Sequence, residues 1–225
     1  MPIITIAQSK GGAGKSTVAL ALASEFAAAG GTVIILDADR QLSLLRWFRE
    51  REASGTNHRS IKVEDASAIG DDKIGVAIAE AARNADLVIV DTEGTANMKT
   101  AYAAQDSDFV IVPTRSSRLD LERTVETQVM LERMCRGTPY RVLVTQTPSA
   151  VRSSAELEID RQIKNQLPTF DVQMHMLDAF RAMFNYRKSL SEVDAEGLAR
   201  AEKARVIAKT ILKQSLQDMT ERKAA

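Results

Sequence analysis

The sequence lacks cysteine pairs, long apolar runs and an N-terminal targeting segment, and each absence excludes a class of protein. Cys135 is the only cysteine, which excludes an internal disulfide and favours a reducing compartment; we expect its side chain to pack from a helix onto the core. No apolar run reaches the roughly 18 residues that a membrane-spanning helix requires. The opening MPIITIAQ has neither the basic nor the apolar region of a signal peptide. We therefore expect a cytoplasmic protein that does not span a membrane.

The sequence also has no net charge. Lys and Arg number 30, and so do Asp and Glu, so the formal net charge is zero. A nucleic-acid binder with a basic field over its whole surface is thereby excluded, and any such surface must be a local patch. No G-x-S-x-G motif is present, so a hydrolase of the nucleophile-elbow type has no support.

Short runs rich in Val and Ile alternate with longer helical patterns along most of the chain. The predicted strands cover residues 3–7, 32–36, 61–63, 87–91, 109–113 and 141–146. The predicted helices cover residues 17–29, 42–52, 75–84, 119–135 and 155–166, with one or two more in 192–225. This alternation predicts an α/β fold with a mostly parallel, doubly wound sheet covered by helices on both faces. Without repeats or a break in composition, residues 1–225 are expected to form a single domain.

The segment QSKGGAGKST, residues 8–17, has the form of a phosphate-binding loop between a strand and a helix. Its glycines let successive backbone N–H groups face phosphate oxygens, and the helix N-terminus adds partial positive charge. Lys15 is placed to reach the β- and γ-phosphates, Ser16 to ligate Mg²⁺, and Thr17 to contact the α-phosphate. The residues predicted to bind ATP are Lys10, Gly11, Gly12, Ala13, Gly14, Lys15, Ser16 and Thr17. The alternative is a glycine-rich turn without a ligand.

Three aspartates end predicted strands, where ligands bind in open α/β sheets. Asp37 and Asp39 follow the second strand in LDADRQ, and Asp91 ends LVIVD in the manner of an aspartate that holds the Mg²⁺ shell. Such residues can instead cap loops or helices, and both interpretations stay open at this point.

The segments KGGAGKST, DADRQLSLLRW, VDTEG and IVPTRSSRLDL together resemble the ParA/MinD family of deviant Walker-A ATPases. Within it the chain is most similar to short ParA-type partition ATPases and VirC-type T-DNA transfer proteins. The similarity runs from Pro2 to at least Gln146 and continues weakly through HMLDAFRAMFNYRKSL. The resemblance implies a P-loop NTPase fold with ATP and Mg²⁺ as ligands.

The resemblance also implies roles for individual residues. Lys10 would reach across a nucleotide-sandwich dimer to the phosphates of the other subunit, and Asp39 would orient the attacking water. The implied catalytic set is Lys10, Lys15 and Asp39, and the implied magnesium set is Ser16, Asp37 and Asp91. The alternative for Lys10 is a contact with its own nucleotide or with solvent. Adenine contacts are expected near residues 145–148.

Two segments depart from the family pattern. Arg40 stands where the family usually has proline, and the third strand ends Asp91-Thr92-Glu93-Gly94 instead of Asp-x-Pro. Glu93 brings a negative charge close to the expected triphosphate. We expect these changes to affect hydrolysis more than ATP binding.

The resemblance implies an ATP-dependent homodimer that binds DNA without sequence specificity and a DNA-bound partner of the centromere-binding type. No helix-turn-helix domain precedes the P-loop, so operator binding by that route is not expected. The candidate DNA-contacting residues are Arg181, Arg187 and Lys188, although solvated surface charges are the commoner case. The apolar stripe Val206, Ile207, Ile211, Leu212 and Leu216 is expected to pack on the core instead of anchoring a membrane.

The function predicted from the sequence is a slow, partner-stimulated ATPase switch in plasmid or chromosome partition, cytoplasmic or associated with the nucleoid. The alternatives are a MinD-like positioning ATPase on a membrane or protein scaffold, a VirC-like helper of conjugative DNA transfer, and a metabolic P-loop enzyme.

Overall fold

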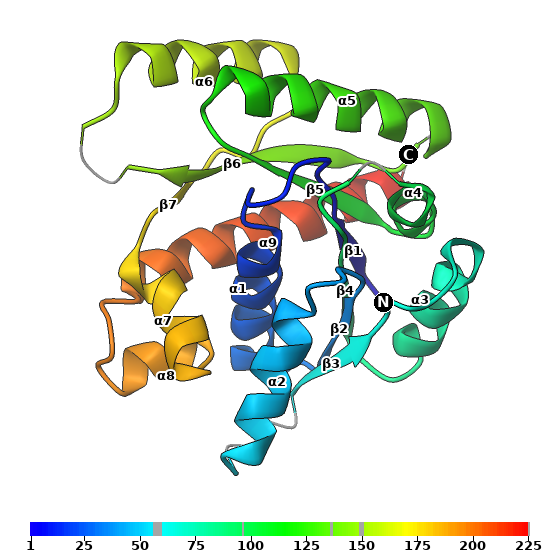
Figure 1. The fold of residues 1–225 in the computed structure, drawn as a ribbon, viewed down its shortest axis with the longest axis vertical. Coiled ribbons are helices and arrows are strands. Elements are labelled where there is room, and N and C mark those ends of the chain that lie inside the picture. Colours follow the sequence, from blue (N-terminus) through cyan, green and yellow to red (C-terminus); the bar gives the residue numbers. More distant parts are fainter. Residues whose placement is uncertain (56–59, 96, 136, 149–150, 225) are drawn as a thin grey trace.

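The computed structural model describes residues 1–55, 60–95, 97–135, 137–148 and 151–224. They form a seven-stranded sheet with the order β3-β2-β4-β1-β5-β6-β7, and the strands pair in parallel (Figure 1). The strands are β1 (Ile3–Ile6), β2 (Val33–Asp37), β3 (Ile61–Asp65), β4 (Leu87–Asp91), β5 (Phe109–Thr114), β6 (Tyr140–Thr147) and β7 (Met174–His175). The predicted parallel α/β fold is confirmed.

Helices cover both faces of the sheet (Figure 1). One face carries α1 (Lys15–Ala28), α2 (Ser43–Ala53), α7 (Asp178–Tyr186), α8 (Leu190–Ala195) and α9 (Glu202–Ala224). The other carries α3 (Ile74–Ala82), α4 (Met98–Gln105), α5 (Arg118–Met134) and α6 (Ser154–Gln166), with a short 3₁₀ helix η1 (Asp71–Lys73) before α3.

Strand β4 illustrates why such strands appear as unbroken apolar runs. Leu87 and Ile89 belong to the buried cluster that includes α1 and α9, whereas Val88 and Val90 belong to the cluster that includes α3. Successive side chains point to opposite faces, and both faces are covered. The continuous run LVIV therefore marks a central strand.

Most predicted elements occur within two residues of their expected bounds, but α4, β7 and α7 were not predicted. Helix α4 is short, and its start is set by Asn97, whose side chain accepts a hydrogen bond from the Thr100 N–H. Strand β7 has only two residues and exists through its pairing with β6. Neither leaves a strong periodic signal.

The C-terminal apolar stripe packs inside the protein. Ile207, Ile211 and Leu212 are buried in the same cluster as α1, and Leu216 packs against that cluster. Val206 alone of the stripe is exposed, at 57%. The core-packing prediction is thus correct for this stripe. Within the described parts of the chain, no helix has the length and apolar character needed to cross a membrane. Cys135, which directly follows α5, is buried as expected.

A buried ion pair joins α2 to α8. Arg51 donates two hydrogen bonds of 2.7 Å to the carboxylate of Glu192 and a third, of 2.9 Å, to the carbonyl of Arg187. Glu192 also accepts from the Ser189 N–H and hydroxyl in a capping box at the start of α8. Burial by itself would raise the pKa of Glu192, but the bonds from Arg51 and Ser189 outweigh it and lower the pKa to about 2.

We predict that Glu192→Gln lowers the free energy of unfolding by about 2 to 4 kcal/mol, because it leaves the buried Arg51 charge without its partner. The depressed pKa means that the contribution of Glu192 is present above pH 4.5 and is lost as the pH falls toward about 2. Urea denaturation at pH 7 measures the effect. Glu196→Gln is the control: its exposed pair with Lys188 should contribute less than about 1 kcal/mol. Equal effects of the two variants would contradict the prediction.

Candidate functional site

The P-loop connects β1 to α1 at the carboxyl edge of the sheet. Gly12 and Gly14 have positive φ values of 77° and 89°, a backbone conformation that other residues adopt only under strain. Gly14 is the residue before α1, and its carbonyl accepts the Val18 N–H at 2.9 Å. The loop therefore ends at the N-terminus of a 14-residue helix, which favours a bound anion.

Lys15 begins α1 and is only 6% exposed. Burial lowers the pKa of its amine, while attraction by Asp91, Asp39 and Glu93 opposes that change. The loop lysine is thus held inside the site among carboxylates of its own chain. A phosphate group placed there would find a cation directed at it from the helix start.

Ser16 and Asp91 form the centre of the site. The Ser16 hydroxyl donates a 2.6 Å hydrogen bond to Asp91 Oδ2, and the other Asp91 oxygen, Oδ1, is buried without a hydrogen-bond partner among the described residues. Burial raises the pKa of Asp91 to about 7, although the Ser16 bond opposes the shift. A hydroxyl beside a carboxylate with an unused buried oxygen is a donor set that suits Mg²⁺.

Magnesium usually takes one or two protein carboxylates, with phosphates and water completing its shell. No group of three or more His, Cys, Asp or Glu side chains is placed to hold a metal by itself in the part of the chain that the structure describes. Ser16 and Asp91 are the two side chains placed to act as ligands to such an ion.

Asp37 and Asp39 have different hydrogen-bond partners in the structure. Asp37 Oδ2 accepts the backbone N–H groups of Leu44 and Leu45, each at 3.0 Å, in the first turns of α2. Asp37 therefore caps the start of α2, which is the alternative role that the sequence left open. Burial raises the pKa of Asp37, although the hydrogen bonds from the backbone oppose this shift. Asp39 Oδ1 accepts the Gln41 N–H at 2.9 Å in a local turn.

Lys10 is paired within its own chain, a contact that the sequence analysis did not anticipate. Its Nζ lies 3.0 Å from Asp120 Oδ1. Asp120 is 2% exposed and also accepts hydrogen bonds from Arg115 Nε, at 3.3 Å, and from the Ser117 hydroxyl. Burial would raise the pKa of Asp120, but the bonds from Ser117, Lys10 and Arg115 lower it. Lys10 is therefore held at the first turn of α5.

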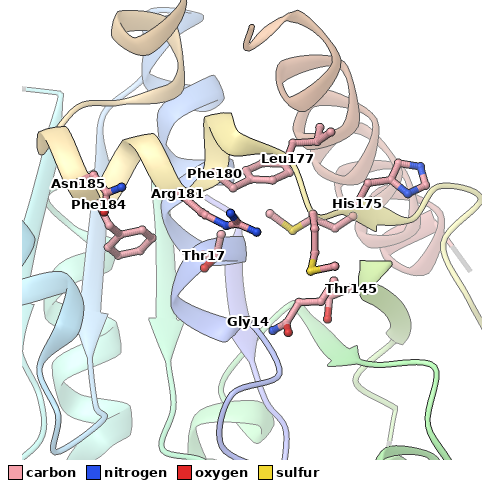
Figure 2. A pocket seen from close by; sticks show the side chains of 12 residues that line it. Gly14, Thr17, Thr145, His175, Leu177, Phe180, Arg181, Phe184 and Asn185 are labelled. Atoms are coloured by element: carbon pink, nitrogen blue, oxygen red, sulfur yellow. The ribbon is translucent and has the colours of Figure 1, made fainter. Parts of the chain in front are cut away.

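A mainly apolar cavity of about 490 Å³ adjoins the P-loop (Figure 2). Gly14 and Thr17 form its P-loop side, and Thr145 and Gln146 contribute from β6. Phe180 and Phe184 of α7 supply the aromatic part of the wall. An apolar cavity beside a phosphate site suits the planar base of a nucleotide. The expected contacts at Thr145 and Gln146 thus line this cavity.

Helix α7, which lines this cavity, was not predicted from the sequence. The signal was present in DAFRAMFNY, where the buried residues Ala179, Phe180, Ala182 and Met183 recur with helical spacing. From the sequence, this segment carries a weak family resemblance and one candidate DNA contact, Arg181, but no predicted helix.

The three candidate DNA-contacting residues lie on or next to α7. Arg181 lines the cavity of Figure 2 and lies 3.6 Å from Asp178. Arg187 pairs with Glu50 at 2.5 Å and Lys188 with Glu196 at 2.8 Å. Their charges are therefore partly neutralised within the chain.

We predict that Asp91→Asn stabilises the ligand-free protein more at pH 8 than at pH 5. The pKa of Asp91 rises from 3.8 to about 7 on folding, so the folded state binds the proton more tightly and wild-type stability falls as the pH rises through this window. Asn carries no charge at either pH, so the stabilisation should be about 2 to 4 kcal/mol larger at pH 8.

Urea denaturation at both pH values, with EDTA present, measures the difference. Asp72→Asn, on the exposed 3₁₀ helix, is the control and should show no such difference. An Asp91→Asn stabilisation that is the same at both pH values would contradict the raised pKa.

Comparison with known proteins agrees with this geometry. A family model described as VirC1 protein matches residues 1–223. Protein ParA from Rhizobium radiobacter is 28% identical over 201 residues, covering 87% of this chain and 88% of the relative. Protein virC1 from the same organism is 28% identical over 193 residues, covering 81% and 80%.

The fold is shared with a solved structure. A putative plasmid partition protein from Borrelia burgdorferi B31, bound to AMPPNP, superposes with a TM-score of 0.74 at 15% identity, covering 96% of this chain and 98% of that one. The family match covers nearly the whole chain, including the P-loop, Asp91 and the segment around α7. This chain therefore belongs to the VirC1 family of ParA-like P-loop proteins.

Proposed function

We propose that this chain is a magnesium-dependent ATPase that dimerises on ATP and acts as a switch in DNA partition or DNA transfer. The observation that carries the proposal is the double-lysine P-loop. Lys15 is buried at the start of α1, next to the hydrogen bond between Ser16 and Asp91. Lys10 lies at the start of the P-loop and forms an ion pair with Asp120. One lysine suffices to bind phosphate within a chain, and by family resemblance the second, Lys10, would leave its Asp120 partner to serve the other subunit of a dimer.

The phosphates of ATP would lie along the loop, with Lys15 on the β- and γ-phosphates and the backbone N–H groups of residues 11–17 around them. The Ser16 hydroxyl and Asp91 would hold Mg²⁺, which when bound neutralises charge on the β- and γ-phosphates. The adenine would enter the cavity between β6, β7 and α7. Nucleotides and Mg²⁺ also occur in structures of this fold: the Borrelia protein holds AMPPNP, and a cobyrinic acid a,c-diamide synthase holds ADP and magnesium.

Hydrolysis would proceed by in-line attack of water on the γ-phosphorus. By family resemblance Asp39 orients this water, and Lys10, Lys15 and the loop N–H groups stabilise the developing charge. Asp37 would contribute by fixing the start of α2, which follows the loop that carries Asp39. Slow turnover that a partner stimulates is expected of a switch.

Dimerisation would move Lys10 from Asp120 to the phosphates bound by the other subunit. Two triphosphates brought face to face repel each other, and a cation supplied by each partner offsets that repulsion. The γ-phosphate then competes with Asp120 for the same ammonium group. The ATP state and the dimer become linked in this way.

Non-specific DNA binding by the dimer would rest on clustered Arg and Lys, with Arg181, Arg187 and Lys188 as candidates. A dimer doubles each cluster, which matters for a chain whose net charge is zero. The expected partner is a DNA-bound protein of the centromere-binding type, and the expected location is the cytoplasm, in association with the nucleoid.

A role in conjugative DNA transfer is the second candidate, because the matching family model is that of VirC1. A MinD-like membrane role is less well supported, since the apolar residues of α9 pack against α1. The partition and transfer roles share the ATP switch and differ in the DNA-bound partner.

We predict salt-sensitive DNA binding that requires ATP. Binding to a duplex of arbitrary sequence should occur with ATP, be absent with ADP or without nucleotide, and weaken at least about tenfold between about 50 and 200 mM salt. Fluorescence anisotropy measures it, and flotation with liposomes serves as the comparison. Recovery with lipid and no DNA binding would contradict the proposal and favour a membrane scaffold.

We predict that Lys10→Ala binds ATP within about threefold of the wild type but loses ATP-dependent dimerisation, because the ammonium group that bridges the subunits is removed. Titration with labelled ATP and sedimentation velocity measure the two properties.

Lys15→Ala should lose nucleotide binding itself, which separates the two lysines. Lys62→Ala, whose side chain is 62% exposed, removes a charge elsewhere and should change neither property. A Lys10→Ala protein that dimerises normally would refute the role in trans.

A further inference from the structure

We propose that Glu93, in the loop after β4, is a catalytic carboxylate for ATP hydrolysis that contacts the attacking water. The inference rests on the proposed ATPase function and adds to it a residue that the family pattern does not supply. From the sequence, Glu93 is expected only to bring a negative charge close to the triphosphate.

The residues on either side of Glu93 are both held against the chain that forms the P-loop. The Thr92 hydroxyl donates a 2.8 Å hydrogen bond to the carbonyl of Ile6, the last residue of β1. On the other side, a Cβ placed on Gly94 would lie 2.7 Å from the Gly11 nitrogen and 3.2 Å from the Lys10 carbonyl carbon. Only glycine permits this approach. Glu93 is therefore confined to the segment that passes the mouth of the P-loop.

The Glu93 side chain is oriented by the start of α4. Asn97 Nδ2 donates to Glu93 Oε2 at 3.3 Å, while Asn97 Oδ1 accepts the Thr100 N–H at 2.9 Å. The Thr95 hydroxyl lies 3.5 Å from the same Glu93 oxygen. These neutral donors orient the Glu93 carboxylate. The carboxylate also attracts the amine of Lys15, which opposes the effect of burial on the pKa of the lysine.

The sheet order places the loop that carries Glu93 directly beside the P-loop strand, although Asp39 attracts the Lys15 amine more strongly than Glu93 does. Strand β4 lies between β1 and β2 and pairs with both, so the loop after β4 is the direct neighbour of the P-loop. Asp39 follows β2, one strand farther away, and its Oδ1 is engaged by the Gln41 N–H. The segment Thr92-Glu93-Gly94, in which Glu93 stands where the family usually has proline, therefore supplies both a carboxylate and a glycine. The glycine lets the backbone next to Glu93 approach Lys10 and Gly11 of the P-loop.

In the proposed step the water oxygen bonds to the γ-phosphorus, and the bond from that phosphorus to the β–γ bridging oxygen breaks. ADP leaves with the electron pair of the broken bond. Glu93 accepts a hydrogen bond from the attacking water and so orients it, while the proton of that water passes to an oxygen of the phosphate product, so ATP and water become ADP and inorganic phosphate. A carboxylate that orients the attacking water in this way is expected to contribute at least about tenfold in rate.

A purely repulsive role of Glu93 and a role in catalysis predict different results for Glu93→Gln. If Glu93 only repels ATP, then Glu93→Gln should tighten ATP binding and leave turnover unchanged or faster. If Glu93 acts on the water, Glu93→Gln should lower kcat at least about tenfold while ATP affinity is kept or improved.

The test measures kcat by release of inorganic phosphate at saturating Mg-ATP, together with ATP affinity by titration. Glu93→Gln should also retain bound nucleotide as ATP after gel filtration, whereas the wild type converts it to ADP. Glu52→Gln, an exposed carboxylate near the end of α2, is the matched control and should behave as the wild type. Unchanged thermal melting of Glu93→Gln excludes unfolding as the cause of a loss.

A Glu93→Gln kcat within about twofold of the wild type would overturn the proposal. Loss of ATP affinity in parallel with kcat would overturn it too, because Glu93 would then support binding. A wild type that does not hydrolyse ATP at all would instead refute the ATPase function on which the inference rests.

Discussion

The position of β4 between β1 and β2 is the constraint on which the site depends. In the parallel register Asp91 stands beside Ile6 on one side and beside Asp37 on the other, so three strand ends lie at one level. The P-loop follows β1 directly, which allows Ser16 to reach Asp91 at 2.6 Å. A parallel sheet brings the carboxyl ends of its strands to one edge, and here that edge carries the polar groups of the site.

This arrangement is electrostatically costly for the ligand-free protein. Asp91 and Lys15 are both buried in the same site. Burial raises the pKa of Asp91 and lowers the pKa of Lys15, so it favours the neutral form of each. Asp91 keeps one buried oxygen without a hydrogen bond among the described residues. Binding a divalent cation together with a polyanion would relieve these strains jointly, which is why a metal–nucleotide complex suits the site better than either component alone.

The remaining features of the site come from distant parts of the chain. The cavity beside the P-loop is closed by α7, more than a hundred residues after Gly14, and Lys10 is held by Asp120 at the start of α5. Arg51 fastens α2 to α8 through Glu192 and so helps to fix the segment that carries α7. The cavity beside the P-loop and the P-loop itself thus depend on helices that pack on the same face of the sheet.

The sequence by itself determined the features that depend on local bonding. Val and Ile runs covered on both faces predict central parallel strands, and KGGAGKST between a strand and a helix predicts a phosphate loop, because backbone geometry there is set by neighbouring residues. Asp91 was predictable as the last residue of such a strand.

The tertiary structure alone decided which residues meet across the chain. The pairing of Lys10 with Asp120, the use of Asp37 as the cap of α2 and the partners of Arg187 and Lys188 join residues whose spacing carries no periodic signal. Strand β7 is defined by its pairing with the edge of β6. The need for glycine at position 94 follows from its close approach to the backbone of Gly11. Side chains choose such partners through burial and distance, which arise only when the sheet and its two layers of helices have come together.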